Sequence, residues 1–261
     1  MKLEVPTLAS LFAEGKKASV VFWVGCAGSF DDRAKKITKA FVKIMNHTKT
    51  SFAVLGTEES CTGDPAKRAG NEFLFQTQAL QNISALDKYG VTKIVTTCPH
   101  CFNTIKNEYP ELGGNYKVMH HTQFLKSLIK EGILKVEGGK YKGKRITFHD
   151  PCYLGRANKI FEAPRSLIKK LDAELVEMKS CKTKGLCCGA GGAQMFKDAE
   201  AGTKEVNIER TEQALDTHPN IIAAACPFCN TMMTDGIKNQ KQEASVKIMD
   251  VAELIANANN L

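Results

Sequence analysis

The sequence has no long hydrophobic run. Its longest uninterrupted apolar stretches, residues 20–24 and 221–226, have the length of a β-strand, whereas a membrane-spanning helix needs about 20 apolar residues. The first residues, MKLEVPT, also lack the apolar segment of a secretory signal peptide. These absences predict a cytoplasmic protein, which could lie peripheral to the inner membrane only through a partner.

Aromatic residues and cofactor-binding motifs are also scarce. The chain has one Trp and five Tyr, and its net charge of +8 comes from lysines spread along segments such as residues 31–46. We interpret those lysines as a solvated face and expect no nucleic-acid binding. No G-x-G-x-x-G opens a helix after a strand, and no C-x-x-C-x-x-C ferredoxin run is present. We therefore expect partners to supply flavin, nicotinamide or ferredoxin-type clusters.

Cysteine, by contrast, is abundant, and its spacing repeats. Ten cysteines in a reducing compartment indicate metal or redox chemistry rather than disulfides. The flanking segments also repeat, since VVFWVGC matches RITFHDPC and KIVTTCPHC matches IIAAACPFC. The chain is therefore a tandem duplication. Eight cysteines pair at offsets of 126, 127, 128 and 128 residues: Cys26 with Cys152, Cys61 with Cys188, Cys98 with Cys226, and Cys101 with Cys229.

The boundary between the two copies is predicted at EGGKYKGK, residues 137–144. Its glycines and charges suit an exposed connection. The N-terminal repeat then covers residues 1–140 and the C-terminal repeat residues 141–261.

Each half alternates short β-rich runs with helical patterns, which is typical of parallel βαβ units. We therefore predict an α/β fold of two tandem, homologous Rossmann-like units with parallel strands and a pseudo-twofold relation. The cysteines would lie past strand ends or before helices, where open α/β sheets bind ligands. The expected strands cover residues 20–24, 52–55, 93–97, 146–149, 174–177 and 221–225, and the expected helices residues 32–46, 69–88, 163–171 and 206–215.

The two halves differ in their number of thiols. Ser60-Cys61 stands in the first half where the second has Cys187-Cys188. Four thiolates suit a cubane [4Fe-4S] cluster, and they equally suit tetrahedral zinc. The N-terminal set is Cys26, Cys61, Cys98 and Cys101, and the C-terminal set is Cys152, Cys187, Cys188, Cys226 and Cys229.

The motif LCCGAGG, between a DPCYLGR loop and an ACPFC loop, resembles the cysteine-rich CCG domain. That domain is found in heterodisulfide reductase catalytic subunits and in the iron–sulfur subunits of glycolate oxidase and lactate utilisation. The resemblance extends in two copies over about residues 18 to 255. It implies an iron–sulfur oxidoreductase that is active with partner subunits: a ferredoxin-type iron–sulfur subunit, which could be membrane-anchored, or a flavoprotein.

For the C-terminal set, the resemblance implies a [4Fe-4S] cluster of the noncubane kind on the five cysteines, with Cys187 and Cys188 at the reactive centre. The N-terminal repeat is degenerate, and either [4Fe-4S] or Zn stays open there. Gly189, Gly191 and Gly192 would let the backbone approach a cluster closely.

Three further residues have expected roles near these loops. Arg156 could offset the charge of a cluster or hold an acidic substrate. His149 could bond a cluster sulfide or move a proton. Cys181, in the lysine-rich MKSCKTKG, is expected to be a free thiol whose pKa the lysines could lower.

The leading functional hypothesis is electron transfer through the C-terminal cluster, between a partner and a disulfide, a quinone pool or a flavoprotein. An alternative is a structural zinc-binding assembly protein without redox turnover, although zinc takes four ligands and one set has five thiols. A third hypothesis, a C-x-x-C thiol–disulfide exchanger, is disfavoured by the wide cysteine frame.

Overall fold

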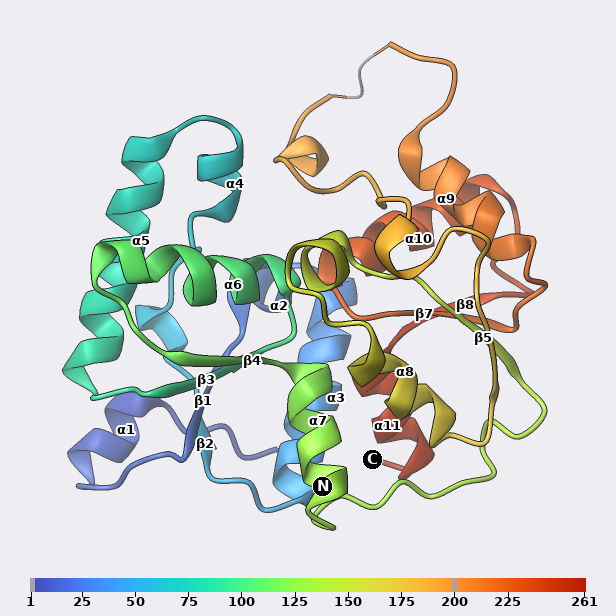
Figure 1. The fold of residues 1–261 in the computed structure, drawn as a ribbon. Helices are drawn as coiled ribbons and strands as arrows, with labels where there is room; N and C mark the ends of the chain where they lie inside the picture. The colour runs from blue at the N-terminus through green and yellow to red at the C-terminus, as the bar shows by residue number, and fades with distance from the viewer. Residues whose placement is uncertain (1–2, 199–200) are drawn as a thin grey trace.

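Two four-stranded parallel sheets organise the chain in the computed structural model, which describes residues 3–198 and 201–261 (Figure 1). The strand orders are β2-β1-β3-β4 and β6-β5-β7-β8, so the second sheet repeats the first. The predicted α/β class with parallel strands is confirmed. The strands are β1 Val20–Trp23, β2 Phe52–Ala53, β3 Lys93–Thr96, β4 Lys117–His120, β5 Arg145–Phe148, β6 Glu174–Val176, β7 Ile221–Ala224 and β8 Lys247–Asp250.

Helices follow the strands in the same sequence in both halves. The predicted helix at residues 69–88 is wrong at its start. Gly70 adopts φ +88°, which ends one helix, and the side chain of Asn71 caps the next by accepting from Leu74 N–H. The helices are α1 Leu8–Ala13, α2 Gly25–Phe30, α3 Asp32–His47, α4 Asp64–Arg68, α5 Glu72–Lys88, α6 Pro99–Asn103, α7 His121–Lys130, α8 Glu162–Lys169, α9 Val206–Leu215, α10 Pro227–Asn239 and α11 Val251–Ala258.

Short segments of other helical types complete the fold. Two of them are π-helical and hold equivalent places near the cysteine loops, η2 Thr104–Glu108 after α6 and η4 Tyr153–Ala157 after Cys152. The 3₁₀ segments are η1 Gly56–Glu58, η3 Tyr109–Leu112, η5 Lys182–Lys184 and η6 Gln194–Phe196. Among the described residues, no helix has both the length and the apolar character that crossing a membrane requires.

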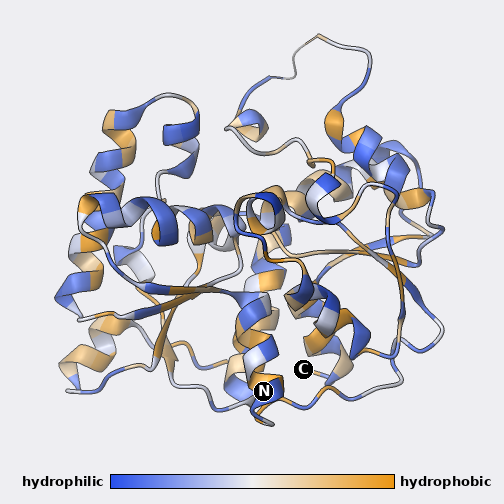
Figure 2. Ribbon diagram, in the orientation of Figure 1, coloured by the Kyte–Doolittle hydropathy of each residue, from blue (hydrophilic) through white to orange (hydrophobic). Residues whose placement is uncertain are grey.

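The halves share one hydrophobic core. Helices α3 and α7 from the first half pack against α8 and α11 from the second, between the two sheets (Figure 1). Phe41 is fully buried there, with its ring centroid 5.0 Å from that of Phe22. The same cluster contains Leu167 and Leu254 from the second half. Apolar residues are concentrated on the strands, while the outer helices are mixed (Figure 2), as expected for parallel sheets covered on both faces.

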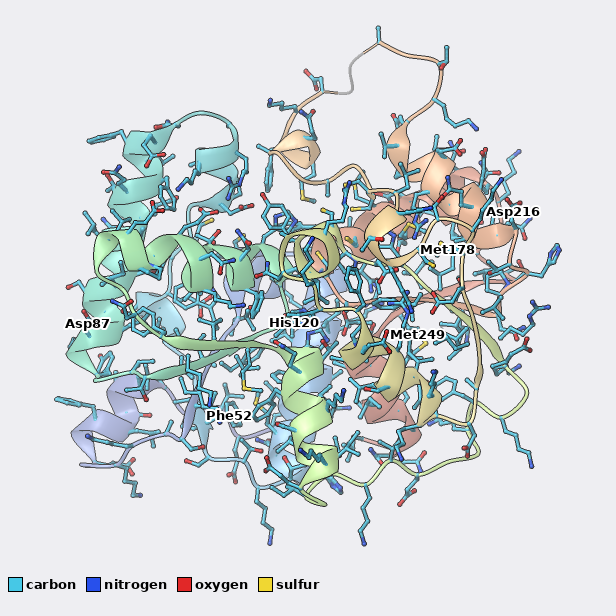
Figure 3. All side chains as sticks on the ribbon, viewed as in Figure 1. Phe52, Asp87, His120, Met178, Asp216 and Met249 are labelled. Carbon is cyan, nitrogen blue, oxygen red and sulfur yellow. The ribbon has the colours of Figure 1, made fainter. Side chains whose placement is uncertain are left out.

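Polar contacts tie the two halves together at this interface. The Arg33 guanidinium donates to both carboxylate oxygens of Glu253 at 2.9 and 2.6 Å. His121 Nε2 and Asp250 Oδ1 lie 3.0 Å apart, and both side chains are fully buried. His120, labelled near the centre of Figure 3, ends β4 and caps α7, as Asp250 ends β8 and caps α11. The boundary at residue 140 stays a prediction.

Phe41→Ala tests whether the halves unfold together. Removing this buried ring leaves a cavity in the shared core, so the free energy of unfolding should fall by about 3–5 kcal/mol. We expect a single denaturant transition, followed by circular dichroism. Phe30→Ala, which removes a ring that is 82% exposed, is the control and should change this free energy by less than about 0.5 kcal/mol. Two separate transitions would contradict a shared core.

Candidate metal centre

The cysteines gather at the carboxyl ends of the central strands of each sheet. Cys26 lies three residues after β1, on α2. Cys98 and Cys226 are the N-cap residues of α6 and α10, and a proline follows each as the first helical residue. The strand order reverses beside β1 and β5, which is where open α/β sheets form their ligand-binding crevice.

The five C-terminal thiols form one chain of contacts. Cys152 Sγ lies 3.9 Å from Cys187 Sγ, and Cys188 Sγ lies 3.2 Å from Cys229 Sγ. The thiols of Cys187 and Cys188 are also hydrogen-bonded neighbours, and so are those of Cys226 and Cys229. The fold therefore assembles a set whose members span residues 152 to 229, as the spacing required.

The CCG loop brings its backbone against these sulfurs. Gly189 N–H donates to Cys187 Sγ at 3.3 Å. Gly189 has φ +90° and Gly192 has φ +68°, a backbone conformation that favours glycine. A Cβ on Gly191 would lie 3.6 Å from the ring of His100. The prediction that these glycines admit a cluster stays a prediction, and the geometry is compatible with it.

The four N-terminal thiols also converge. The Cys26 thiol is hydrogen-bonded to Cys61, and the Cys98 thiol to Cys101. A Cβ on Gly25 would lie 3.3 Å from Cys101 Sγ. The carboxylate of Glu59 accepts from the backbone N–H groups of Val24 and Gly25 at 3.1 and 2.6 Å, which fixes the loop that leads to Cys26.

The two sets touch each other, which the sequence did not predict. The thiols of Cys98 and Cys226 are hydrogen-bonded neighbours across the interface between the halves. Helix α6 packs on η4 of the second half, and α10 packs on α2 of the first. The His100 ring lies between the halves, with its centroid 4.4 Å from Tyr153 and 5.3 Å from Phe228. Nine thiols therefore form one continuous sulfur-lined centre.

The thiols affect each other's ionisation. Hydrogen bonding to Cys26 lowers the pKa of Cys61 to about 7. Hydrogen bonding to Cys187 raises the pKa of Cys188 to about 12, and burial raises that of Cys226 well above the usual range. Neighbouring thiols cannot all become thiolates unless positive charge is brought among them. A bound metal ion or cluster supplies that charge and deprotonates its ligands.

The donor atoms fit such a group. Sulfur ligands without carboxylates select zinc, copper(I) or iron–sulfur clusters rather than magnesium or calcium. Among the described residues, one grouping with metal-ligand spacing is His149, Cys188 and Cys229, whose ligand atoms lie within 4.8 Å of one another. The residues thus fit a thiolate-bound metal or cluster, and His149 lies beside it.

Other predicted residues have different surroundings. Arg156 is exposed, and among the hydrogen bonds of the described residues its guanidinium makes none to a cysteine, so its cofactor role stays a prediction. The expectation that lysines lower the pKa of Cys181 is wrong, because burial and then Glu177 raise it. Ser60 is no helix cap, since its hydroxyl bonds Asn82 Oδ1 at 3.1 Å and the N-cap of α4 is Gly63.

Two buried arginines support the C-terminal loops, and sequence reasoning missed both. The Arg165 guanidinium donates to both oxygens of Asp150 at 2.7 and 2.8 Å and to both oxygens of Glu177. Arg210 donates from Nε to His149 Nδ1 at 3.0 Å. Burial, and then the Arg210 charge, lower the pKa of His149 to about 3. Both arginines stand in ordinary helical patterns, so no sequence signal separates them from surface arginines.

This geometry defines a class: a duplicated α/β protein with two joined thiol-rich sites at its strand ends. Residues 20–106 and 146–234 each match the family model described as the cysteine-rich domain, CCG. The chain therefore belongs to the CCG family, in two copies, and the resemblance predicted from its motifs is confirmed.

Its relatives are iron–sulfur oxidoreductases. It is 46% identical to a probable iron–sulfur-binding oxidoreductase, FadF, of Bacillus subtilis, over 98% of this chain and 36% of that protein. It is 44% identical to the EtfAB:quinone oxidoreductase of Syntrophomonas wolfei, over 94% and 35%. Identity to one subunit of the dihydromethanophenazine:CoB–CoM heterodisulfide reductase of Methanosarcina barkeri is 35%, over 93% and 59%. The chain thus spans about a third of the length of the first two relatives.

One solved structure shares the fold at a level that can be interpreted. A hypothetical protein from Helicobacter pylori superposes with a TM-score of 0.57, covering 92% of this chain and 48% of that one, at 7% identity. This likeness concerns the fold alone.

Arg165→Met tests the support beneath the Cys152 loop. Arg165 is 2% exposed and its partner Asp150 is 3% exposed, so the variant leaves a buried carboxylate without its cation. We expect the free energy of unfolding to fall by about 3–5 kcal/mol in denaturant titrations. Lys204→Met breaks an exposed pair with Glu209 and Glu212 and should leave stability unchanged. Equal effects of the two variants would contradict the role given to Arg165.

Proposed function

We propose that this chain is the electron-transferring unit of an iron–sulfur oxidoreductase, heterodisulfide-reductase-like in its centre. In this proposal the C-terminal set holds a [4Fe-4S] cluster of the noncubane kind, and the N-terminal set holds a second [4Fe-4S] cluster. The observation that carries the proposal is the contact chain of five thiols from Cys152 to Cys226. That set has one thiolate more than zinc can bind.

The chain's own residues prepare this centre. When bound, an iron–sulfur cluster supplies a carrier that takes up and releases one electron. Cys188, Cys226 and Cys229 are at most 2% exposed, so the protein excludes water from the inner side of the set. The α10 N-terminus lies at Cys226 and directs its positive end toward the thiolates. Cys187 is partly exposed, and we assign Cys187 and Cys188 to the reactive side.

Electrons must enter and leave through other molecules. The sequence has no G-x-G-x-x-G and no ferredoxin run, and relatives include a quinone oxidoreductase and a component of a heterodisulfide reductase. We propose a flavoprotein or ferredoxin-type partner as donor and a quinone or disulfide as acceptor. Each passage moves one electron from donor to acceptor. Two passages reduce the acceptor, which takes up two protons. The unit would act in the cytoplasm, with a membrane reached only through a partner.

The N-terminal set supports a second candidate at that site. Four thiols, Cys26, Cys61, Cys98 and Cys101, match the four ligands of structural zinc. A zinc ion there would make the first half a support for the second. Zinc in both halves would correspond to an assembly protein without redox turnover.

Metal analysis separates these possibilities. For protein purified without oxygen from iron-replete cells, we expect about eight irons and eight sulfides per chain, with visible absorption and an EPR signal on reduction, because two [4Fe-4S] clusters carry that content. About four irons with one zinc would assign zinc to the N-terminal set. Zinc without iron would refute electron transfer.

Cys187→Ser tests the five-thiol set directly. The variant removes one sulfur from the C-terminal set and none from the N-terminal set, so the C-terminal EPR signal should be lost or reshaped while the N-terminal metal remains. Cys181→Ser is the matched control, since Cys181 lies outside both sets, and its spectrum should equal that of the parent protein. An unchanged spectrum for Cys187→Ser would exclude Cys187 as a ligand.

A further inference from the structure

A buried arginine determines which nitrogen of His149 carries a proton. Both side chains are fully buried, and Arg210 Nε lies 3.0 Å from His149 Nδ1. An arginine can only donate hydrogen bonds, so His149 Nδ1 must be the acceptor. The ring proton of the neutral imidazole is then on Nε2.

Arg210 is itself held in this orientation. Its second nitrogen donates to Ser180 O at 2.8 Å and to Gln213 Oε1 at 3.0 Å. Those partners come from the loop before the CCG motif and from α9, so the guanidinium cannot turn away from His149 without breaking both bonds. The tautomer of His149 is therefore set by the fold.

The proton on Nε2 faces the sulfur atoms. Nε2 has no hydrogen-bond partner among the described residues. A ring nitrogen of His149 lies within 4.8 Å of the Cys188 and Cys229 sulfurs, and Nδ1 is already occupied by Arg210. Buried N–H groups rarely stay unpaired, so an acceptor is expected at this position.

The same hydrogen bond disqualifies His149 as a metal ligand. A metal-bound histidine donates its other N–H to a carboxylate, a carbonyl or water, and here the other nitrogen meets a donor. A nitrogen that bears a proton has no lone pair to give to a metal. The apparent Cys–Cys–His grouping is thus a thiolate site with a donor beside it.

We propose that Arg210 is a positioning residue that holds His149 as a hydrogen-bond donor to the sulfur atoms of the C-terminal centre and prevents it from binding metal. This inference rests on the proposed function, in that the C-terminal set must hold an iron–sulfur cluster. A hydrogen bond to cluster sulfur favours the reduced, more negative state, so the donor raises the midpoint potential.

The first half has a donor at the equivalent strand position. Trp23 precedes Cys26 by three residues, as His149 precedes Cys152. Trp23 is fully buried, and its Nε1 also has no hydrogen-bond partner among the described residues. An indole N–H can only donate. Both halves therefore place a donor that cannot ligate behind their cysteines, and only the histidine needs an arginine to make it so.

Pulsed EPR of the reduced holoprotein labelled with ¹⁵N-histidine tests the inference. We expect a weak nitrogen coupling typical of an N–H···S bond, which His149→Phe abolishes while iron and sulfide stay unchanged. Exchange into D₂O should shift the Fe–S stretching bands in resonance Raman spectra, and His149→Phe should reduce that shift. The midpoint potential should become more negative in His149→Phe and stay closer to the parent value in His149→Gln, which keeps an N–H.

The role of Arg210 has its own variants. Arg210→Met frees the tautomer, so the His149 coupling should split or grow to the size of a direct iron–nitrogen bond. Arg210→Lys, which keeps a donor, should retain the weak coupling. Arg33→Met is the matched control, because Arg33 pairs with Glu253 away from the cysteines, and its coupling should equal that of the parent protein.

The outcomes separate this inference from the proposed function. A preparation without iron overturns both. A cluster with no His149 coupling, or with a coupling of direct-ligation size in the parent protein, overturns the inference and leaves the cluster assignment intact. Should Arg210→Met fail to fold, the comparison of His149→Phe with His149→Gln still decides whether His149 is a donor.

Discussion

The convergence of nine thiols on one interior is the constraint on which the rest of the structure depends. Buried thiols so close together oppose one another's ionisation, as the separated pKa values of Cys61 and Cys188 show. Such a set is compatible with folding only if bound positive charge compensates the thiolates. The surrounding features serve that convergence: prolines at the helix starts, glycine in the CCG loop, and the Arg165 pair beneath Cys152.

Duplication supplied two copies of this arrangement, which then diverged in chemistry. The strand orders are the same, and the cysteine loops follow the same strands. Yet the first half has Ser60 and Trp23 where the second has Cys187 and His149. The first set keeps four sulfurs and a donor that cannot titrate. The second gains a fifth sulfur and an adjustable donor under the control of Arg210.

Features repeated along the chain could be predicted from the sequence, and features made by packing could not. Constant cysteine offsets predicted the two sets, and apolar runs between turn residues predicted six strands to within about two residues. The break at Gly70-Asn71 was readable from its residues and was overlooked. The contact between Cys98 and Cys226 depends on how the halves dock, and the roles of Arg165 and Arg210 depend on burial, which a helical pattern of mixed residues does not reveal.

The exposure of the cysteines follows from this docking and bears on how the centre communicates. Cys98, Cys101, Cys188, Cys226 and Cys229 are buried, while Cys26, Cys61, Cys152 and Cys187 are partly exposed. The buried members include the pair at which the two sets touch, so the inner side of each set faces the other set. The partly exposed members form the outer sides. A carrier with one side turned inward and one turned outward can exchange electrons with its neighbour through protein and with a partner through the surface. The same packing that joins the halves thus also separates internal from external transfer.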